Sequence, residues 1–258
     1  CSSDLMLMHG SGSYSLFNNR NCTFRFFNMI GGNIGWYSDY SAACIQHAWP
    51  YLYGGFGYGG VRSTNDGAGS YMNQVKNAKL YVTFGNNPAV TRASGGGQSW
   101  ELYGALREGK TRMVVIDPIC TDTLAGRDAE WVAIRPGTDA ALCEGMAWVM
   151  INENLVDQAF LDKYCVGYDE KTLPKSAPKG SDYKSYILGQ GPDKTAKTPL
   201  WASRITQVPV ETIERLAREI ATTKPVFISQ GWGPQRRMNG ETQSTAIAMM
   251  ALLTGQVR

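Results

Sequence analysis

The sequence predicts an α/β fold in which crossover helices connect the strands of a Rossmann-like parallel sheet. From residue 79 onward, short apolar runs that end in Gly or Asp alternate with segments of helical periodicity. Short continuous apolar runs are typical of strands that are buried on both faces of a parallel sheet. Strands and helices at this spacing match β–α–β units, in which each helix returns the chain to the same end of the sheet.

Four apolar runs are the expected strands: Leu80–Phe84, Met113–Ile116, Trp131–Ile134 and Val226–Ile228. The expected helices cover residues 99–106, the segment after Thr138, the segment after Pro209, and residues 244–253. Thr138 is a plausible N-cap, and Leu142, Met146 and Met150 share one face of the helix that follows it. Residues 166–200, rich in Lys, Pro, Gly and Ser, are expected to form an irregular excursion.

Composition excludes some classes of protein and site. The net charge is +3 over 258 residues, without a basic block, so a nucleic-acid partner is not expected. No apolar run is long enough to span a membrane. The six cysteines form no C-x-x-C pair and there are two histidines, so we expect no zinc site or iron–sulfur cluster within this chain, and cysteines that are free and mostly buried. Both ends resemble cut ends, and we expect a fragment of a longer protein.

Glycine and polar residues collect where the expected strands end. Ligands of open parallel sheets bind beyond the carboxyl ends of the strands, where Gly permits close backbone approach and helix N-termini favour anions. The candidates there are Gly85, Asn86, Asn87, Asp117, Pro136, Gly137, Thr138, Asp139, Gly231, Trp232, Gln235 and Arg236. Such residues are more often turn or cap residues, so this pattern alone is a weak indication of a nucleotide-containing ligand. The G-x-G-x-x-G fingerprint of nicotinamide enzymes is missing, which argues against a nicotinamide-dependent dehydrogenase.

Five segments, in order along the chain, carry a resemblance to a known family: FGNNPAVTRASGGG (84–97), VIDPICTDT (115–123), IRPGTDAAL (134–142), AFLDKYCVGYDEKTLP (159–174) and FISQGWGPQRRMNGE (227–241). Together they resemble the catalytic subunits of the dimethyl sulfoxide reductase family. The resemblance implies part of a larger multi-domain molybdenum enzyme subunit, with the metal between two molybdopterin guanine dinucleotides. It also implies that residues 1–45 belong to a split α/β domain, that 46–223 form an inserted dinucleotide-binding-like domain, and that 224–258 return to the split domain.

The resemblance assigns roles to individual residues. Asn86, Asn87, Asp117, Thr138 and Asp139 become candidates for contacting one guanine dinucleotide, while Gly85, Pro136 and Gly137 belong to the same segments. Gly231, Trp232, Gln235 and Arg236 become candidates for the region near the other cofactor or the metal. Ser41, in the stretch Tyr37–Ser41, is the candidate metal ligand, although Ser38 stands where the family's motif has Gly. Tyr14 is a candidate substrate-side aromatic residue.

The implied activity is reduction of S-oxides or N-oxides by oxygen-atom transfer in anaerobic respiration. A 4Fe-4S cluster is expected in the full-length protein, outside this chain. The implied partners are an iron–sulfur electron-transfer subunit and a membrane anchor subunit. The implied location is peripheral, at the bacterial cell membrane on its periplasmic face. We expect the isolated chain to be inactive. The alternatives are a nicotinamide-dependent dehydrogenase and a non-catalytic relative of the family.

Overall fold

The computed structural model describes residues 19–34, 43–53, 71–91 and 97–257, and the chain divides into two compact units, Cys1–Ala43 and Cys44–Arg258. In the first unit, helix α1 (Asn19–Met29) exposes Phe26 and Met29. It ends where Gly31 and Gly32 adopt positive φ, and the Gly32 N–H donates to the Phe27 carbonyl at 2.8 Å. This is the left-handed exit that glycine permits at the end of a helix.

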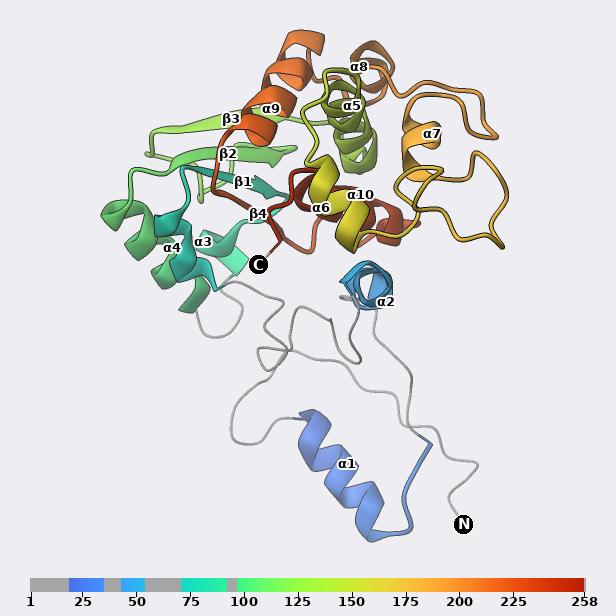
Figure 1. Cartoon of the computed structure of the whole chain (residues 1–258). Helices are drawn as coiled ribbons and strands as arrows, with labels where there is room; N and C mark the ends of the chain where they lie inside the picture. Colours follow the sequence, from blue (N-terminus) through green and yellow to red (C-terminus); the bar gives the residue numbers. More distant parts are fainter. Residues whose placement is uncertain (1–18, 35–42, 54–70, 92–96, 258) are drawn as a thin grey trace. The chain divides into compact units, whose positions relative to one another are not determined.

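The second unit is built on a four-stranded parallel sheet (Figure 1). Its strands are β1 (Leu80–Phe84), β2 (Arg112–Asp117), β3 (Ala129–Ala133) and β4 (Val226–Gln230), in the order β3-β2-β1-β4. Leu80 lies opposite both Arg112 and Val226, and Met113 lies opposite Ala129. The predicted α/β class and all four predicted strands are therefore confirmed.

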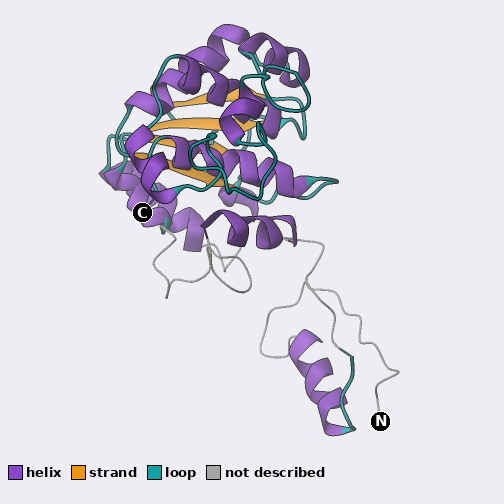
Figure 2. Cartoon of the chain, turned by 45° about the vertical axis from the view of Figure 1, so that its right-hand side comes forward, coloured by secondary structure: helices purple, strands orange, loops and turns teal. Residues whose placement is uncertain are grey.

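Helices cover both faces of the sheet (Figure 2). Leu80, Val82 and Phe84 face a core shared with α5 (Asp139–Asn152), α9 (Val210–Thr222) and α10 (Gly240–Leu253). The intervening Tyr81 joins a second core with η2 (Met72–Asn77) and α4 (Gly97–Glu108). Successive side chains of a strand point to opposite faces, so one apolar strand supplies both cores.

Helix α5 is the centre of the larger core. It packs against α9, α10 and α8 (Pro199–Thr206), and nearly every residue from Asp139 to Ile151 is buried. The prediction of a single apolar face was therefore too narrow, because a helix enclosed by three others is apolar all round.

The remaining helices are α2 (Ala43–Tyr53), α3 (Pro88–Thr91), α6 (Gln158–Tyr164) and α7 (Tyr183–Ile187). The excursion at 166–200 is mostly turns, as predicted, but it contains α7, which begins where Asp182 Oδ1 accepts from the Ser185 N–H at 2.8 Å. Helix α10 begins four residues before the predicted start, because its first turn is polar and lacks apolar periodicity.

The structure also bears on the expected burial of the cysteines and on the predicted domain boundaries. The described cysteines are free, but Cys143 alone among them is buried, and Cys22 and Cys120 are exposed, so the expectation of mostly buried thiols was wrong. The predicted domain boundaries at 45 and 223 stay predictions. The sheet itself continues past 223, because β4 pairs with β1.

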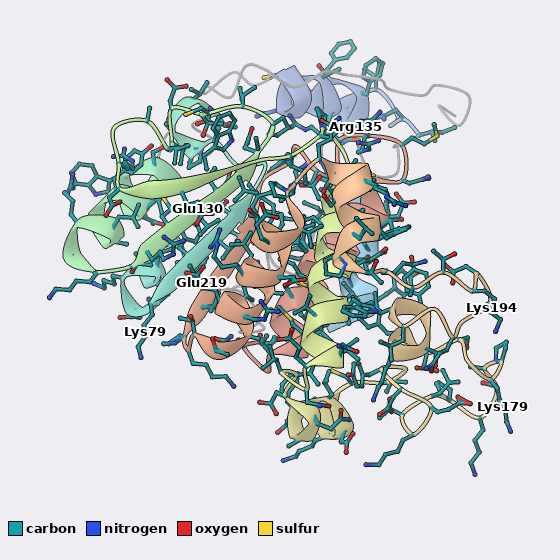
Figure 3. All side chains as sticks on the ribbon, turned by 90° about the horizontal axis from the view of Figure 1, so that it is seen from above. Lys79, Glu130, Arg135, Lys179, Lys194 and Glu219 are labelled. Atoms are coloured by element: carbon teal, nitrogen blue, oxygen red, sulfur yellow. The ribbon has the colours of Figure 1, made fainter. Side chains whose placement is uncertain are left out.

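The amino end of the sheet carries an ion network instead of a glycine-rich surface. Arg112 on β2 contacts Glu130 on β3 and Glu219 on α9, and Arg215 contacts the same two carboxylates. Figure 3 labels Glu130 on β3 and Glu219 on α9. The four side chains pair with one another, and ligands of open parallel sheets bind at the opposite, carboxyl ends of the strands.

Candidate functional site

The strand order places a topological switch point between β1 and β4. The chain moves from β1 to β2 and β3 on one side and returns to β4 on the other side of β1. Helix α4, which follows β1, and helix α10, which follows β4, pack on opposite faces of the sheet. In doubly wound sheets, this is the crevice in which dinucleotides bind.

Two glycines bring the loops after β1 and β4 together. The Gly231 N–H donates to the Phe84 carbonyl at 2.8 Å. A Cβ at Gly231 would lie 2.2 Å from the Gly85 carbonyl oxygen, and a Cβ at Gly85, whose φ is +49°, would lie 2.5 Å from Pro234 Cδ. Neither position accepts a side chain, so the backbone of both predicted residues forms the floor of the switch point.

The two asparagines after β1 differ in their surroundings. Asn86 is buried. Asn87 uses its amide oxygen within the protein, where it accepts from the Thr123 hydroxyl at 2.7 Å and from the Thr123 N–H at 3.2 Å. Asn87 therefore anchors the turn after β2, a structural role that the sequence did not indicate. A ligand contact by either asparagine stays a prediction.

Asp117 ends β2 and is buried at the same edge. Its Oδ1 accepts from the Ile119 N–H at 3.1 Å, and its carbonyl accepts from Trp131 Nε1 at 2.9 Å. Burial raises the pKa of the Asp117 carboxyl above its ordinary value, and the Ile119 N–H opposes that shift. Asp117 is thus first a turn residue, as its position before Pro118 suggests.

The loop between β3 and α5 contains the most perturbed carboxylate of the candidate set. Pro136 is exposed, and Gly137 adopts a φ of +71°, which favours glycine. Asp139 begins α5 and is 5% exposed. Burial raises its pKa to about 6, with a further rise from Asp117 that is opposed by its own N–H and by Arg237. A buried carboxylate at a helix start is a strong hydrogen-bond acceptor.

Thr138 occupies the N-cap position of α5, but its side chain does not cap the helix. The Thr138 hydroxyl donates instead to the Arg135 carbonyl at 2.7 Å. The cap comes from α10, where Gln243 Oε1 accepts from the Ala140 N–H at 2.7 Å. The predicted N-cap position was right and the predicted side-chain cap was wrong, because an acceptor from a distant helix replaces the local one.

The loop after β4 forms a compact turn. Gln235 is 1% exposed and its Nε2 donates to the Trp232 carbonyl at 3.4 Å. The Arg236 guanidinium lies 4.8 Å from the centre of the Trp232 ring, and both side chains are exposed at the edge. Trp232 and Arg236 thus place an aromatic ring and a cation at the exposed surface of this turn, Gln235 shapes the turn, and a ligand contact by any of the three stays a prediction.

Two candidates cannot be placed: Tyr14 and Ser41 lie outside the described residues. Among the residues that the structure does describe, no group of three or more His, Cys, Asp or Glu could hold a metal ion. Within the same residues, no helix is long and apolar enough to cross a membrane.

Sequence reasoning missed three residues at this edge: Gln230, Arg237 and Gln243. Both amide atoms of Gln230, the last residue of β4, are buried without a hydrogen-bond partner in the described structure. Buried amides are nearly always hydrogen-bonded, so the Gln230 amide is a candidate for contact with a ligand or a water. No local pattern marks these residues; Arg237 and Gln243 act on the loop between β3 and α5, which is remote from them in sequence.

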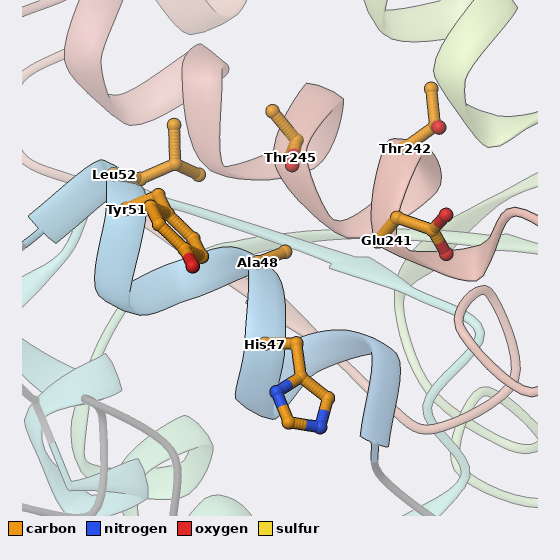
Figure 4. Close-up of a pocket in the computed structure, with 7 residues that line it drawn as sticks. All are labelled: His47, Ala48, Tyr51, Leu52, Glu241, Thr242 and Thr245. Carbon is orange, nitrogen blue, oxygen red and sulfur yellow. The ribbon is translucent and has the colours of Figure 1, made fainter. Parts of the chain in front are cut away.

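A groove of about 440 Å³ lies elsewhere, between α2 and α10 (Figure 4). His47 and Tyr51 line it from α2, and Glu241 and Thr245 from α10. Trp49 Nε1 donates to the Ser244 carbonyl at 3.4 Å, and the Tyr53 hydroxyl to the Ala248 carbonyl at 3.2 Å, so the helices run side by side in parallel. None of the predicted cofactor contacts lines this groove.

Comparisons with known proteins identify relatives. Residues 7–258 match the family described as molybdopterin oxidoreductase. The chain is 58% identical over 233 residues to dimethyl sulfoxide reductase DmsA of Escherichia coli, covering 90% of this chain and 27% of that protein. It is 28% identical to trimethylamine-N-oxide reductase of Haemophilus influenzae, covering 96% of this chain and 30% of that protein. The chain therefore spans under a third of these relatives' length.

A solved structure shares the fold. Acetylene hydratase from Pelobacter acetylenicus superposes with a TM-score of 0.54 at 20% identity, covering 85% of this chain and 28% of that chain. With the family match over nearly the whole chain, the comparisons support a molybdenum–molybdopterin cofactor over a nicotinamide one. The chain belongs to the molybdopterin oxidoreductase family.

Proposed function

We propose that this chain is part of the catalytic subunit of a molybdenum reductase that removes oxygen from S-oxides or N-oxides. The observation that carries the proposal is the 58% identity to a dimethyl sulfoxide reductase over 90% of the chain. The trimethylamine-N-oxide reductase relatives extend the substrate class to N-oxides. In the net reaction, an oxide, two electrons and two protons yield the reduced substrate and water.

The residues of the carboxyl edge fit a guanine dinucleotide form of the cofactor. The Asp139 carboxylate is an acceptor suited to the adjacent N–H groups of a guanine edge, and the unpartnered Gln230 amide offers a donor and an acceptor. Gly85 and Gly231 let the loops after β1 and β4 pack against each other, while Trp232 and Arg236 offer stacking and positive charge. The molybdenum, when bound, supplies the two-electron chemistry, and these residues bind and orient its organic part.

The family resemblance is the support for the proposals on the other parts of the enzyme. We propose Ser41 as the metal ligand and Tyr14 as a substrate-side residue. The full-length protein would carry a 4Fe-4S cluster and receive electrons from an iron–sulfur subunit held by a membrane anchor, on the periplasmic face of a bacterial membrane in anaerobic respiration. The isolated chain is expected to be inactive.

The test uses the full-length protein. Wild type should reduce dimethyl sulfoxide or trimethylamine N-oxide with a reduced viologen dye, and acid hydrolysis should release GMP. Asp139→Asn, which replaces the acceptor carboxylate by an amide, should lower the GMP content, because a charge-assisted hydrogen bond typically contributes about 1.5–3 kcal/mol. A protein with molybdenum and GMP but no reductase activity would support the non-catalytic alternative.

A further inference from the structure

The first turn of α5, which carries Asp139, is held by a helix remote in sequence. The first N–H groups of any α-helix lack intrahelical acceptors. Here the Thr138 hydroxyl is engaged with the Arg135 carbonyl and does not satisfy them. Gln243 Oε1, from the first turns of α10, accepts from the Ala140 N–H at 2.7 Å, and both residues are buried.

This hydrogen bond acts on the peptide unit that begins at Asp139. The Ala140 N–H lies in the same rigid plane as the Asp139 Cα and carbonyl. Fixing that N–H therefore fixes the direction in which the Asp139 Cα presents its carboxylate. A local Thr138 cap would have tied α5 to its own loop, whereas Gln243 ties it to α10 and so to the loop after β4.

A second contact joins the loop before α5 to the loop before α10. The Arg237 guanidinium, from the loop before α10, occupies the space that a side chain at Gly137 would need. The groups whose charges act on Asp139 are Arg237 from this loop and Asp117 from β2. Gln243 adds an acceptor without adding a third charge.

We propose that Gln243 is a positioning residue for the cofactor: by capping α5 from α10, it aligns the Asp139 carboxylate with the guanine-type edge it binds. The proposal rests on the proposed role of Asp139. It also explains why the cap is an amide, since a carboxylate at this position would favour the protonated form of Asp139. Protonated Asp139 would be a weaker acceptor for the N–H groups of the base.

The experiment measures the rate at which GMP-containing cofactor is lost from the full-length protein during dialysis. Gln243→Ala should raise this rate roughly fivefold, the factor expected for removal of a capping hydrogen bond. Gln243→Glu keeps the acceptor, so its loss rate should stay near wild type at pH 8. At pH 6.5 its loss rate should rise, because the added carboxylate raises the pKa of Asp139.

Gln256→Ala is a matched control. Gln256 Oε1 accepts from the Val226 N–H at 2.7 Å at the amino end of β4. The variant therefore removes the same kind of hydrogen bond at the opposite ends of the strands. It should reduce thermal stability and leave cofactor loss unchanged.

Three results would overturn the proposal. One is an unchanged loss rate in Gln243→Ala while Asp139→Asn loses cofactor, which removes this proposal alone. Another is an equal increase of the loss rate in Gln256→Ala, because the faster loss of cofactor would then reflect lower stability of the whole protein. The third is full retention in Asp139→Asn, which removes the role of Asp139 and this proposal with it. If Gln243→Ala does not fold, the pH dependence of Gln243→Glu decides.

Discussion

Gly145→Ala should destabilise helix α5, although the same change stabilises most helices. Gly145 lies in the interior of α5, where replacing glycine by alanine normally contributes about 0.8–1 kcal/mol. Here an added Cβ would lie 2.5 Å from Ala202 Cβ on α8 and 3.5 Å from Ile213 Cγ2 on α9. Carbon atoms pack at about 3.5–4 Å, so α8 would have to move by roughly 1 Å.

The size of the effect follows from two opposing contributions. Overpacking of a core typically costs about 1–3 kcal/mol, which exceeds the gain in helix propensity. We expect a net loss on the order of 1 kcal/mol in the free energy of opening α5. Gly104 is the matched control, since it lies inside α4 and an added Cβ meets nothing within 4 Å. Gly104→Ala should stabilise α4 by about 1 kcal/mol.

Hydrogen exchange of the backbone amides is the suitable assay, because it reports opening of each helix separately in a multi-domain protein. Amides of α5 should exchange faster in Gly145→Ala, and those of α4 more slowly in Gly104→Ala. On an Ala202→Gly background, the cost of Gly145→Ala should largely disappear, since the colliding methyl group is gone. Equal stabilisation by both alanine variants would refute the close contact between α5 and α8.

Three further predictions concern polar groups. Tyr186→Phe removes the hydroxyl that donates to the buried Glu144 carboxylate at 3.1 Å. Urea denaturation should show a decrease of about 1–3 kcal/mol in the free energy of unfolding, and a decrease below 0.5 kcal/mol, on the order of experimental error, would contradict this prediction. In the cofactor-free protein, the pKa of Asp139 is raised from 3.8 to about 6, so the contribution of Asp139 to the free energy of unfolding falls as the pH rises from 4 to 6. Asp139→Asn should flatten this part of the curve of stability against pH. An unchanged curve would contradict the burial of this carboxyl group. Glu130→Gln weakens a half-exposed ion network with Arg112, so it should cost about 1 kcal/mol or less, and the cost should shrink in high salt.

Much of the carboxyl edge could be predicted from the sequence because its parts are local. Leu80–Phe84 ends in Gly85, and Val226–Gln230 ends in Gly231, so strand ends and loop starts are visible as adjacent residues. Parallel strands share one carboxyl edge, so Asp117 and Asp139, which each follow or end an apolar run, are expected at the same edge from their order in the chain. The family resemblance then supplied a ligand class that strand ends alone indicate only weakly.

The tertiary structure decided the roles of several side chains. Asn87 holds Thr123 through its amide oxygen, while its ligand contact stays a prediction. Thr138 lies at the predicted cap position, yet the capping group is Gln243, 103 residues further along the chain from Ala140. Short helices such as α7 were also missed, since five residues show no periodicity.

The sequence by itself determined the fold class, the strands and the end of the sheet at which the candidate site is predicted, because apolar periodicity and glycine act on neighbouring residues. Only the tertiary structure decided which groups satisfy one another there. The Gln243 cap, the unpartnered Gln230 amide and the contact between Gly145 and Ala202 depend on how remote helices pack. A hydrogen bond or a steric contact depends on distance in space to within a few tenths of an ångström, and spacing along the chain does not carry that information.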